Sequence, residues 1–285
     1  MLSPARWRDY ALLMRLDKPV GIGLLLWPTL WALWIAGDGW PDPAIVAVFV
    51  LGVIVMRSAG CVVNDYADRD FDPHVVRTRD RPIAAGRVSP QEALVLFALL
   101  CLLAFGLVLL MNPLTIGLAV PGALLAASYP FMKRWTYLPQ AYLGLAFSWG
   151  IPMAFAAQTG TVAPVAWWVF AANLLWAIAY DTFYALVDIE DDRRIGVKSS
   201  AILFGKAVWP VTAALQVAVL GCLVVVGWRA NLGAMYGFGL LGAAAVALYQ
   251  QWLVRGLEPA RCFKAFRVSN LFGAAVFAGI AASFF

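Results

Sequence analysis

The chain has 285 residues, of which 63% are hydrophobic and 13% are charged, and its mean hydropathy is +0.80. A water-soluble domain normally carries about twice that charged fraction, so the composition excludes a soluble globular protein and indicates an integral membrane protein. The four cysteines lie far apart and form no CxxC pair, and the single histidine has no second ligand near it, so neither a redox motif nor a zinc site is indicated.

Apolar runs long enough to cross a bilayer as helices recur along the chain, with only short polar interruptions. Segment 1–19 is too short and too mixed for a cleaved signal peptide, so we expect the first span to act as its own insertion signal. The turns at Asn112-Pro113 and at Asn231 are so tight that each flanking pair could instead form one long broken helix. We predict an all-α polytopic membrane protein with nine transmembrane helices in one domain. The predicted spans are 20–36, 43–63, 90–111, 113–131, 139–157, 163–187, 208–228, 232–254 and 266–285.

Positive charge is distributed on one side of this nine-span topology. All but two of the 21 Lys and Arg residues fall in the N-terminal segment or in the loops after the second, fourth, sixth and eighth spans. Cytoplasmic loops retain positive charge, so the N-terminus and these loops are predicted to be cytoplasmic. The net charge of +5 follows from this bias and needs no nucleic acid to explain it. The exceptions are Arg229, on the opposite side, and Arg57, inside a span.

The stretch 57–72, RSAGCVVNDYADRDFD, is unusually charged for a membrane edge. On a helix advancing about 100° per residue, Asp65, Asp68 and Asp72 fall within a narrow arc, whereas Asp70 points the other way. Asn64, Cys61 and Arg57 share the arc of the three carboxylates. One helix face would therefore carry an amide, three carboxylates and, about two turns deeper, a guanidinium.

A second acidic stretch, YDTFYALVDIEDDRR at 180–194, repeats this arrangement at the end of the sixth span. Helical spacing places five side chains on one stripe and turns Glu190 away. The stripe consists of Asp181, Tyr184, Asp188, Asp191 and Asp192. Because a basic loop follows each stretch, the chain is predicted to contain two pseudo-related halves, about 15–135 and 136–254, plus a last helix, all within a single domain 1–285.

Convergent carboxylates repel one another unless cations neutralise them. Oxygen-only ligand sets favour hard ions, and Mg²⁺ is typically held by one or two carboxylates together with substrate phosphates. These acids could instead mark solvated helix ends. Against that, two aligned clusters occupy equivalent positions, and the negative helix C-terminus makes carboxylates there unfavourable. The pattern predicts a Mg²⁺–diphosphate site for a substrate with a long apolar tail.

These motifs resemble those of the UbiA family of intramembrane prenyltransferases. Residues 64–72 match the family's first motif, NDxxDxxxD, and residues 180–192 match its second, YDxxYAxxDxxxD. Other stretches are similar to the bacterial branch that acts on 4-hydroxybenzoate, including RLDKPVGIGLLLWPTLWALW, YPFMKRWTYLPQ and DTFYALVDIEDDRRIGVKSSAILFG. The similarity runs from about residue 15 to residue 205.

The resemblance implies nine helices around a central cavity that opens sideways to lipid, in a bacterial inner membrane. It also implies Mg²⁺-dependent transfer of a polyprenyl group from polyprenyl diphosphate to carbon 3 of 4-hydroxybenzoate, a step of ubiquinone biosynthesis. In that interpretation the motif carboxylates hold Mg²⁺ and diphosphate. They are Asp65, Asp68, Asp72, Asp188 and Asp192. The length of the prenyl chain and the oligomeric state of the protein are not determined by the sequence.

Further side chains are candidates for substrate binding. Asn64 and Asp181 are polar members of the two stripes, and Tyr184 could shield an allylic cation by cation–π contact. Loop cations could bind diphosphate or cap the cavity, although topology alone would also place them there: Arg79, Arg81, Lys133, Arg134 and Lys198. Arg57 is expected either to pair with the carboxylates of its own face or to hold the benzoate carboxylate.

Two alternatives remain open on the sequence. A related prenyltransferase could use another acceptor, such as homogentisate or haem, because the spacing addresses only the metal–diphosphate half of the site. A secondary transporter could also carry intramembrane charges and a pseudo-repeat. Transporter sites are expected near the bilayer midplane, however, whereas these acids cluster at one edge.

Overall fold

The computed structural model describes residues 4–285, and every regular element in that range is helical, which confirms the all-α class. The longer helices are α2 (Val20–Ala36), α3 (Pro43–Ala67), α4 (Pro90–Val108), α5 (Pro113–Ser128), α8 (Pro164–Ala185), α11 (Val208–Arg229), α12 (Ala234–Val254) and α13 (Pro259–Ala282). The shorter ones are α1 (Pro4–Leu13), α6 (Pro139–Ser148), α7 (Gly150–Thr159), α9 (Ile189–Ile195) and α10 (Ser200–Phe204). Three 3₁₀ turns, η1 (Asp72–His74), η2 (Tyr129–Arg134) and η3 (Gly205–Ala207), complete the series.

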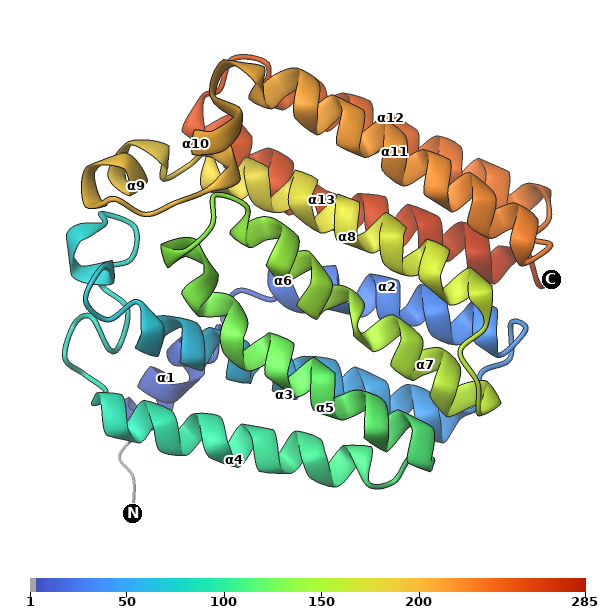
Figure 1. Cartoon of the computed structure of the whole chain (residues 1–285), viewed down its shortest axis with the longest axis horizontal. Helices are drawn as coiled ribbons and strands as arrows, with labels where there is room; N and C mark the ends of the chain where they lie inside the picture. Colours follow the sequence, from blue (N-terminus) through green and yellow to red (C-terminus); the bar gives the residue numbers. More distant parts are fainter. Residues whose placement is uncertain (1–3) are drawn as a thin grey trace.

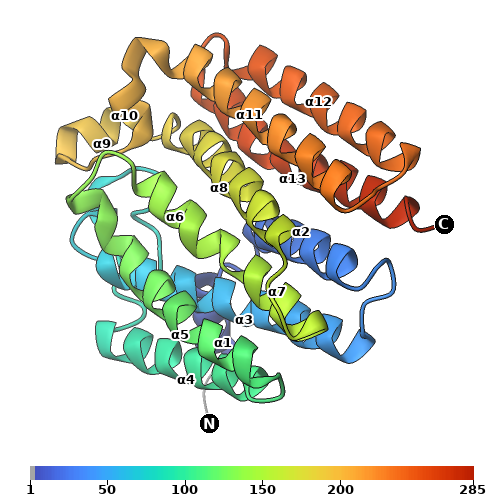
Figure 2. The same ribbon diagram turned by 45° about the vertical axis from the view of Figure 1, so that its right-hand side comes forward.

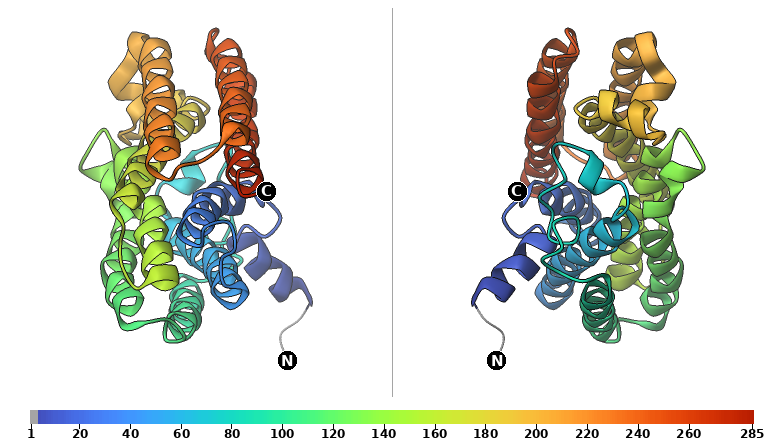
Figure 3. Two further views of the ribbon diagram at one scale, coloured as in Figure 1. Left: turned by 90° about the vertical axis from the view of Figure 1, so that its right-hand side faces the viewer. Right: turned by 90° about the vertical axis from the view of Figure 1, so that its left-hand side faces the viewer.

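The long helices run roughly along one axis (Figure 1) and form a ring when viewed end-on (Figure 3). Each helix contacts the next in the order α2, α3, α4, α5, α6, α8, α11, α12 and α13, and α13 closes the ring against α2. Side chains fill part of this ring, because α2 also packs on α7 and α8. The centre of that packing is a row of buried aromatic rings. The ring centroids of Trp31 and Trp176 are 5.5 Å apart, and those of Trp176 and Phe272 are 5.4 Å apart.

Local signals account for where several helices begin. The side chain of Asp42 accepts hydrogen bonds from the first turn of α3, and Ser89 and Glu92 form a capping box at the start of α4. Asn112 caps α5 directly before Pro113. Asn231 has a positive φ of 51° between α11 and α12, which pack against each other. Both tight turns therefore separate two helices, and neither lies inside one long broken helix.

Six described helices are long and apolar enough to cross a membrane, and α8 with α9 adds a seventh if this pair, bent by 83°, is one span. The chain is thus a membrane protein, while the count of nine spans stays a prediction. The expected span 139–157 is divided into α6 and α7. The expected start at residue 266 is wrong, because α13 begins at Pro259, where proline is favoured in the first helical turn. Lys264 and Arg267 therefore lie on that helix and not in a loop.

One end of the bundle collects the segments that the sequence marked as functional. Figures 1 and 2 show α9, α10 and the loop after α3 together at this end, with the C-terminus at the opposite end. The turn η2 between α5 and α6 also contacts α3. Two acidic motifs separated by more than a hundred residues are thereby brought to the same end.

Candidate active site

The first acidic motif does not continue as one helical stripe. Helix α3 ends at Ala67, Asp68 is its C-cap residue, and Asp72 lies in η1. The predicted arc of Asp65, Asp68 and Asp72 on one helix is therefore wrong in geometry. Three stacked carboxylates in the last turns would repel each other and face the negative helix terminus, whereas a turn lets loop cations reach each of them.

Two arginines hold the buried carboxylates of this motif. Arg15 donates to both oxygens of Asp65, at 2.8 and 3.0 Å, and Arg81 lies 3.1 Å from the same carboxylate. Arg81 also donates to both oxygens of Asp72, at 3.0 and 2.9 Å. Asp65 is only 1% exposed and Asp72 only 5%. Arg81 thus fixes the distance between the helix end and η1.

Asp68 is arranged differently from its neighbours. Its Oδ2 atom accepts a hydrogen bond from Asn64 at 3.1 Å and pairs with the Lys133 ammonium from η2. Its Oδ1 atom is buried and has no hydrogen-bond partner among the described residues. An unpaired buried carboxylate oxygen is costly, so this atom is suited to a cation that enters the site.

Asp72 shows the effect of burial on this motif. Burial raises the pKa of its carboxyl to about 6, and the nearby Asp68 and Asp65 carboxylates add to the effect, although Arg81 opposes it. The three carboxylates of this motif face three cations, Arg15, Arg81 and Lys133, so their formal charges balance, and burial is the main cause of the raised pKa.

The second motif is also broken. Helix α8 ends at Ala185, and α9 leaves at an angle of 83°. Asp181 and Tyr184 consequently lie on α8, Asp188 lies at the junction, and Asp191 and Asp192 lie on α9, so the predicted single stripe is wrong. The bend turns the acidic segment towards the loop after α3.

Arg77 from that loop contacts the second motif. Its Nε donates to both oxygens of Asp188 at 3.0 Å, its guanidinium lies 4.6 Å from the centre of the Tyr184 ring, and it also donates to the Tyr184 hydroxyl. Asp191 pairs with Arg194 at 3.4 Å on its own helix. Within residues 4–285, Asp192 forms no ion pair, and Lys133 and Arg77 are the cations that act on it electrostatically. Lys133 therefore lies between the two motifs.

The remaining predicted loop residues are not all brought to the carboxylates. Arg134 donates to the carbonyl of Ala67 and stacks on Phe71 and Phe131, so it caps the end of α3. Lys198 donates to the carbonyl of Trp135 at 3.3 Å and lies over the Tyr137 ring. Arg79 is exposed. Asp70 and Glu190, which were predicted to point away from the two stripes, are also exposed.

Arg57 lies eight residues before Asp65 on α3. At a rise of about 1.5 Å per residue, it is about 12 Å further from the acidic end of the helix. Among the described residues its guanidinium forms no ion pair and no hydrogen bond, so the expected pairing with the carboxylates of its own face is wrong. Tyr129, Tyr180, Tyr184 and Asp181 lie within electrostatic range of it.

Three residues near the motifs were missed by the sequence reasoning. Arg15 and Arg77 were counted only as topological charges, although each pairs with a motif carboxylate. Tyr129 is close to Arg57 and carried no signal of its own. Cytoplasmic loops carry many arginines for topological reasons alone. Counting charges therefore does not distinguish an arginine that binds a ligand from one that only sets the topology.

The donor set fits a hard divalent cation in its chemistry. The available donors are carboxylate oxygens, which Mg²⁺ prefers, and one of them, Asp68 Oδ1, is buried without a partner. In the arrangement of residues 4–285, no three His, Cys, Asp or Glu side chains are close enough together to form a metal cluster. Arg15, Arg77, Arg81 and Lys133 occupy positions against the carboxylates instead.

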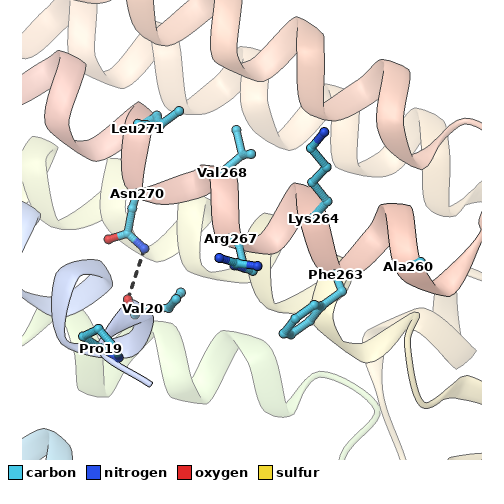
Figure 4. Close-up of a pocket in the computed structure, with 9 residues that line it drawn as sticks. All are labelled: Pro19, Val20, Ala260, Phe263, Lys264, Arg267, Val268, Asn270 and Leu271. Atoms are coloured by element: carbon cyan, nitrogen blue, oxygen red, sulfur yellow. Dashed lines mark hydrogen bonds between the residues drawn. The ribbon is translucent and has the colours of Figure 1, made fainter. Parts of the chain in front are cut away.

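A surface hollow of about 690 Å³ lies between the start of α2 and α13 (Figure 4). Asn270 bridges its two walls by donating to the Val20 carbonyl at 3.2 Å. Phe263 lines the hollow and its ring lies 6.3 Å from Tyr184. Phe263 therefore borders the hollow and also lies beside Tyr184 of the second motif.

Comparison with known proteins agrees with this geometry. The UbiA prenyltransferase family profile matches residues 25–275. A protein of Nitrosococcus oceani named 4-hydroxybenzoate octaprenyltransferase is 66% identical over 272 residues, which cover 95% of each chain.

Two solved structures show the same fold. The apo structure of a UbiA homologue from Aeropyrum pernix K1 has a TM-score of 0.81 at 24% identity and covers 91% of this chain and 97% of its own. A UbiA homologue from Archaeoglobus fulgidus bound to GPP and Mg²⁺ has a TM-score of 0.73 at 17% identity, covering 95% of this chain and 99% of its own.

Proposed function

Because this chain belongs to the UbiA prenyltransferase family, we propose that it transfers a polyprenyl group from a polyprenyl diphosphate to carbon 3 of 4-hydroxybenzoate. The observation that carries the proposal is the meeting of two acidic motifs, with interleaved cations, at one end of an apolar bundle. The 66% identical relative is named for the octaprenyl group, so octaprenyl diphosphate is the donor to test first.

The motif carboxylates are proposed to hold Mg²⁺, and they are Asp65, Asp68, Asp72, Asp188 and Asp192. When bound, Mg²⁺ would supply positive charge that offsets the charge of the diphosphate leaving group. Asp68 supports this role best, because its free oxygen is already buried. The Archaeoglobus relative was solved with GPP and Mg²⁺, which supports the same pairing here.

The loop cations are proposed to bind the diphosphate. Arg77, Arg81 and Lys133 each contact a motif carboxylate and carry N–H groups suited to phosphate oxygens. Asn64 and Asp181 remain candidates for polar contacts with the substrates. Arg134 and Lys198 keep only an indirect role, through the end of α3 and the loop around Trp135.

The acceptor is proposed to bind deeper, with its carboxylate on Arg57. An unpaired guanidinium inside a bundle favours an anionic ligand, and Arg57 lies about 12 Å from Asp65 along α3, so an acceptor on Arg57 would lie deeper than the metal–diphosphate end. The ring carbon ortho to the phenol hydroxyl attacks the allylic carbon as its bond to the diphosphate breaks. Loss of the proton from that ring carbon restores aromaticity. The Tyr184 face shields the allylic positive charge.

The wider architecture is also a proposal. We infer nine spans, by adding α2 and the α6–α7 pair to the seven segments identified by length and composition. The N-terminus and both motifs would face the cytoplasm from the bacterial inner membrane, as the loop charges favour. The hollow between α2 and α13 supports a sideways opening through which the prenyl tail reaches lipid.

The test is product formation by membranes that contain the protein, supplied with Mg²⁺, octaprenyl diphosphate and 4-hydroxybenzoate. We expect prenylated acid to form, and Asp65→Asn and Asp188→Asn each to lower the rate by at least ~100-fold. Chelation of divalent metal should stop the reaction and Mg²⁺ should restore it. If homogentisate is prenylated and 4-hydroxybenzoate is not, the acceptor assignment is wrong, and saturable uptake without product would favour a transporter.

A further inference from the structure

A glycine at the start of α2, Gly21, lies against Arg57 of α3. A Cβ atom built on Gly21 would lie 2.3 Å from Nε, 2.5 Å from one terminal nitrogen and 2.7 Å from Cζ of Arg57. Real Cβ atoms do not approach other atoms this closely, so any side chain at residue 21 must displace the guanidinium. The guanidinium of Arg57 therefore occupies the space in which a side chain at residue 21 would begin.

The backbone of Gly21 gives no other reason for glycine. Gly21 lies in the first turn of α2 and is not among the described glycines with positive φ. Glycine is disfavoured in a helix relative to alanine, because it loses more conformational freedom on folding. The contact with Arg57 is the feature of this position that requires the absence of a side chain.

The guanidinium has little else to hold it in place. It makes no hydrogen bond or ion pair with the described part of the chain, so its position depends on packing. Across from it on α8, the Tyr180 hydroxyl is buried and also has no hydrogen-bond partner. Tyr180 and Arg57 lie within electrostatic range of each other. Two donors from different helices, the half-buried Arg57 guanidinium and the buried Tyr180 hydroxyl, thus lack a hydrogen-bond acceptor among the described residues.

We propose that Gly21 is a positioning residue that seats the Arg57 guanidinium against α2, so that its N–H groups face the carboxylate of the aromatic acceptor beside Tyr180. This inference rests on the proposed function, because it takes an aromatic acid as the acceptor. A side chain at residue 21 moves the guanidinium and leaves the metal–diphosphate end, about two turns away, unchanged. The effect is therefore specific to the acceptor.

The test compares Gly21→Ala, Arg57→Ala and the double variant. Gly21→Ala should raise the KM for 4-hydroxybenzoate by ~10- to 100-fold, as expected when a charge-assisted hydrogen bond is lost, and leave the KM for the diphosphate unchanged. Arg57→Ala should do the same. Because both variants act through one guanidinium, the double variant should be no worse than Arg57→Ala.

The chain offers two matched controls. Gly23→Ala, on the same helix, places a Cβ 2.0 Å from Asn270 Oδ1, so it introduces a similar clash away from Arg57. Gly52→Ala, on the helix of Arg57, meets no atom within 4 Å. Both should leave the KM for the acid within about twofold of the original. Stabilisation of the purified protein against heat by 4-hydroxybenzoate should be lost in Gly21→Ala and kept in both controls.

The outcomes separate the two levels of the argument. If the original protein forms no prenylated acid, the proposed function fails. If Arg57→Ala leaves the KM for the acid unchanged, the acceptor role of Arg57 fails. If Arg57→Ala raises that KM and Gly21→Ala does not, or if the two effects multiply in the double variant, the positioning role of Gly21 is overturned while the proposed function stands.

Discussion

The two acidic motifs lie at the same end of the bundle, but their surroundings differ. Asp65 and Asp72 are almost fully buried, and Arg15 and Arg81 neutralise them through a connected network. Asp188 has a side chain that is 14% exposed and a single arginine partner, which is itself 34% exposed. The first motif is therefore part of the buried interior (the framework), whereas the second is more accessible and lines the site (the wall). We infer that the first fixes the position of the site and the second adapts to the substrate.

The largest expected difference between the motifs is in stability. Asp65 itself is 1% exposed, and Asp65→Asn leaves two largely buried arginines without their full partner, so it should lower the free energy of unfolding by about 3–5 kcal/mol. Asp188→Asn removes a half-exposed pair and should cost no more than about 1 kcal/mol. Thermal unfolding in detergent measures both. Equal losses of stability would contradict the distinction between framework and wall.

The next effect tests the link between the motifs. Lys133 pairs with Asp68 and acts on Asp192, so Lys133→Gln should raise the KM for the diphosphate by ~10-fold with a smaller change in the KM for the acid. Lys198→Gln is the control, because Lys198 donates to a backbone carbonyl outside the motifs. Steady-state kinetics with each substrate varied in turn would distinguish the two lysines. If both variants change the KM values in the same way, Lys133 does not link the two motifs in the way proposed.

A smaller effect is expected at the end of α3. Arg134→Gln removes a cation from the last carbonyls of that helix and should destabilise the protein by about 1 kcal/mol, with little change in either KM. Unfolding and kinetics on the same preparation measure the two properties. An increase in the KM for the diphosphate alone would instead indicate that Arg134 binds the diphosphate.

The smallest effect belongs to Asp70, which lies between Asp68 and Asp72 in sequence but is exposed and, among the described residues, pairs with Arg69 at 3.7 Å. Asp70→Asn should leave rate and stability within about twofold and about 0.5 kcal/mol of the original. Asp72→Asn, two residues away, should lower the rate by at least ~100-fold. Similar losses in both variants would show that net charge, and not the geometry of the motif, governs activity.

The sequence by itself determined the membrane class, the positions of most helices and the identity of the acidic motifs. These properties depend on local information: apolar length, proline and cap residues at helix starts, and the spacing of carboxylates. Asp70 and Glu190 are exposed, but Asp70 lies in the turn after α3 and Glu190 on α9, so the continuous helices from which the sequence turned them away do not account for this.

The tertiary structure alone decided which cation meets which carboxylate. Helical stripes were expected to run through Asp72 and Asp192, but both helices end early and the chain turns, since carboxylates are unfavourable at a helix C-terminus. Arg15 and Arg77 reach the motifs from segments 50 and 111 residues away in sequence. Arg57 was expected to pair with a carboxylate, but in the structure it lies against Gly21. Such contacts join distant segments, and local sequence patterns carry no information about which of many loop arginines will make them.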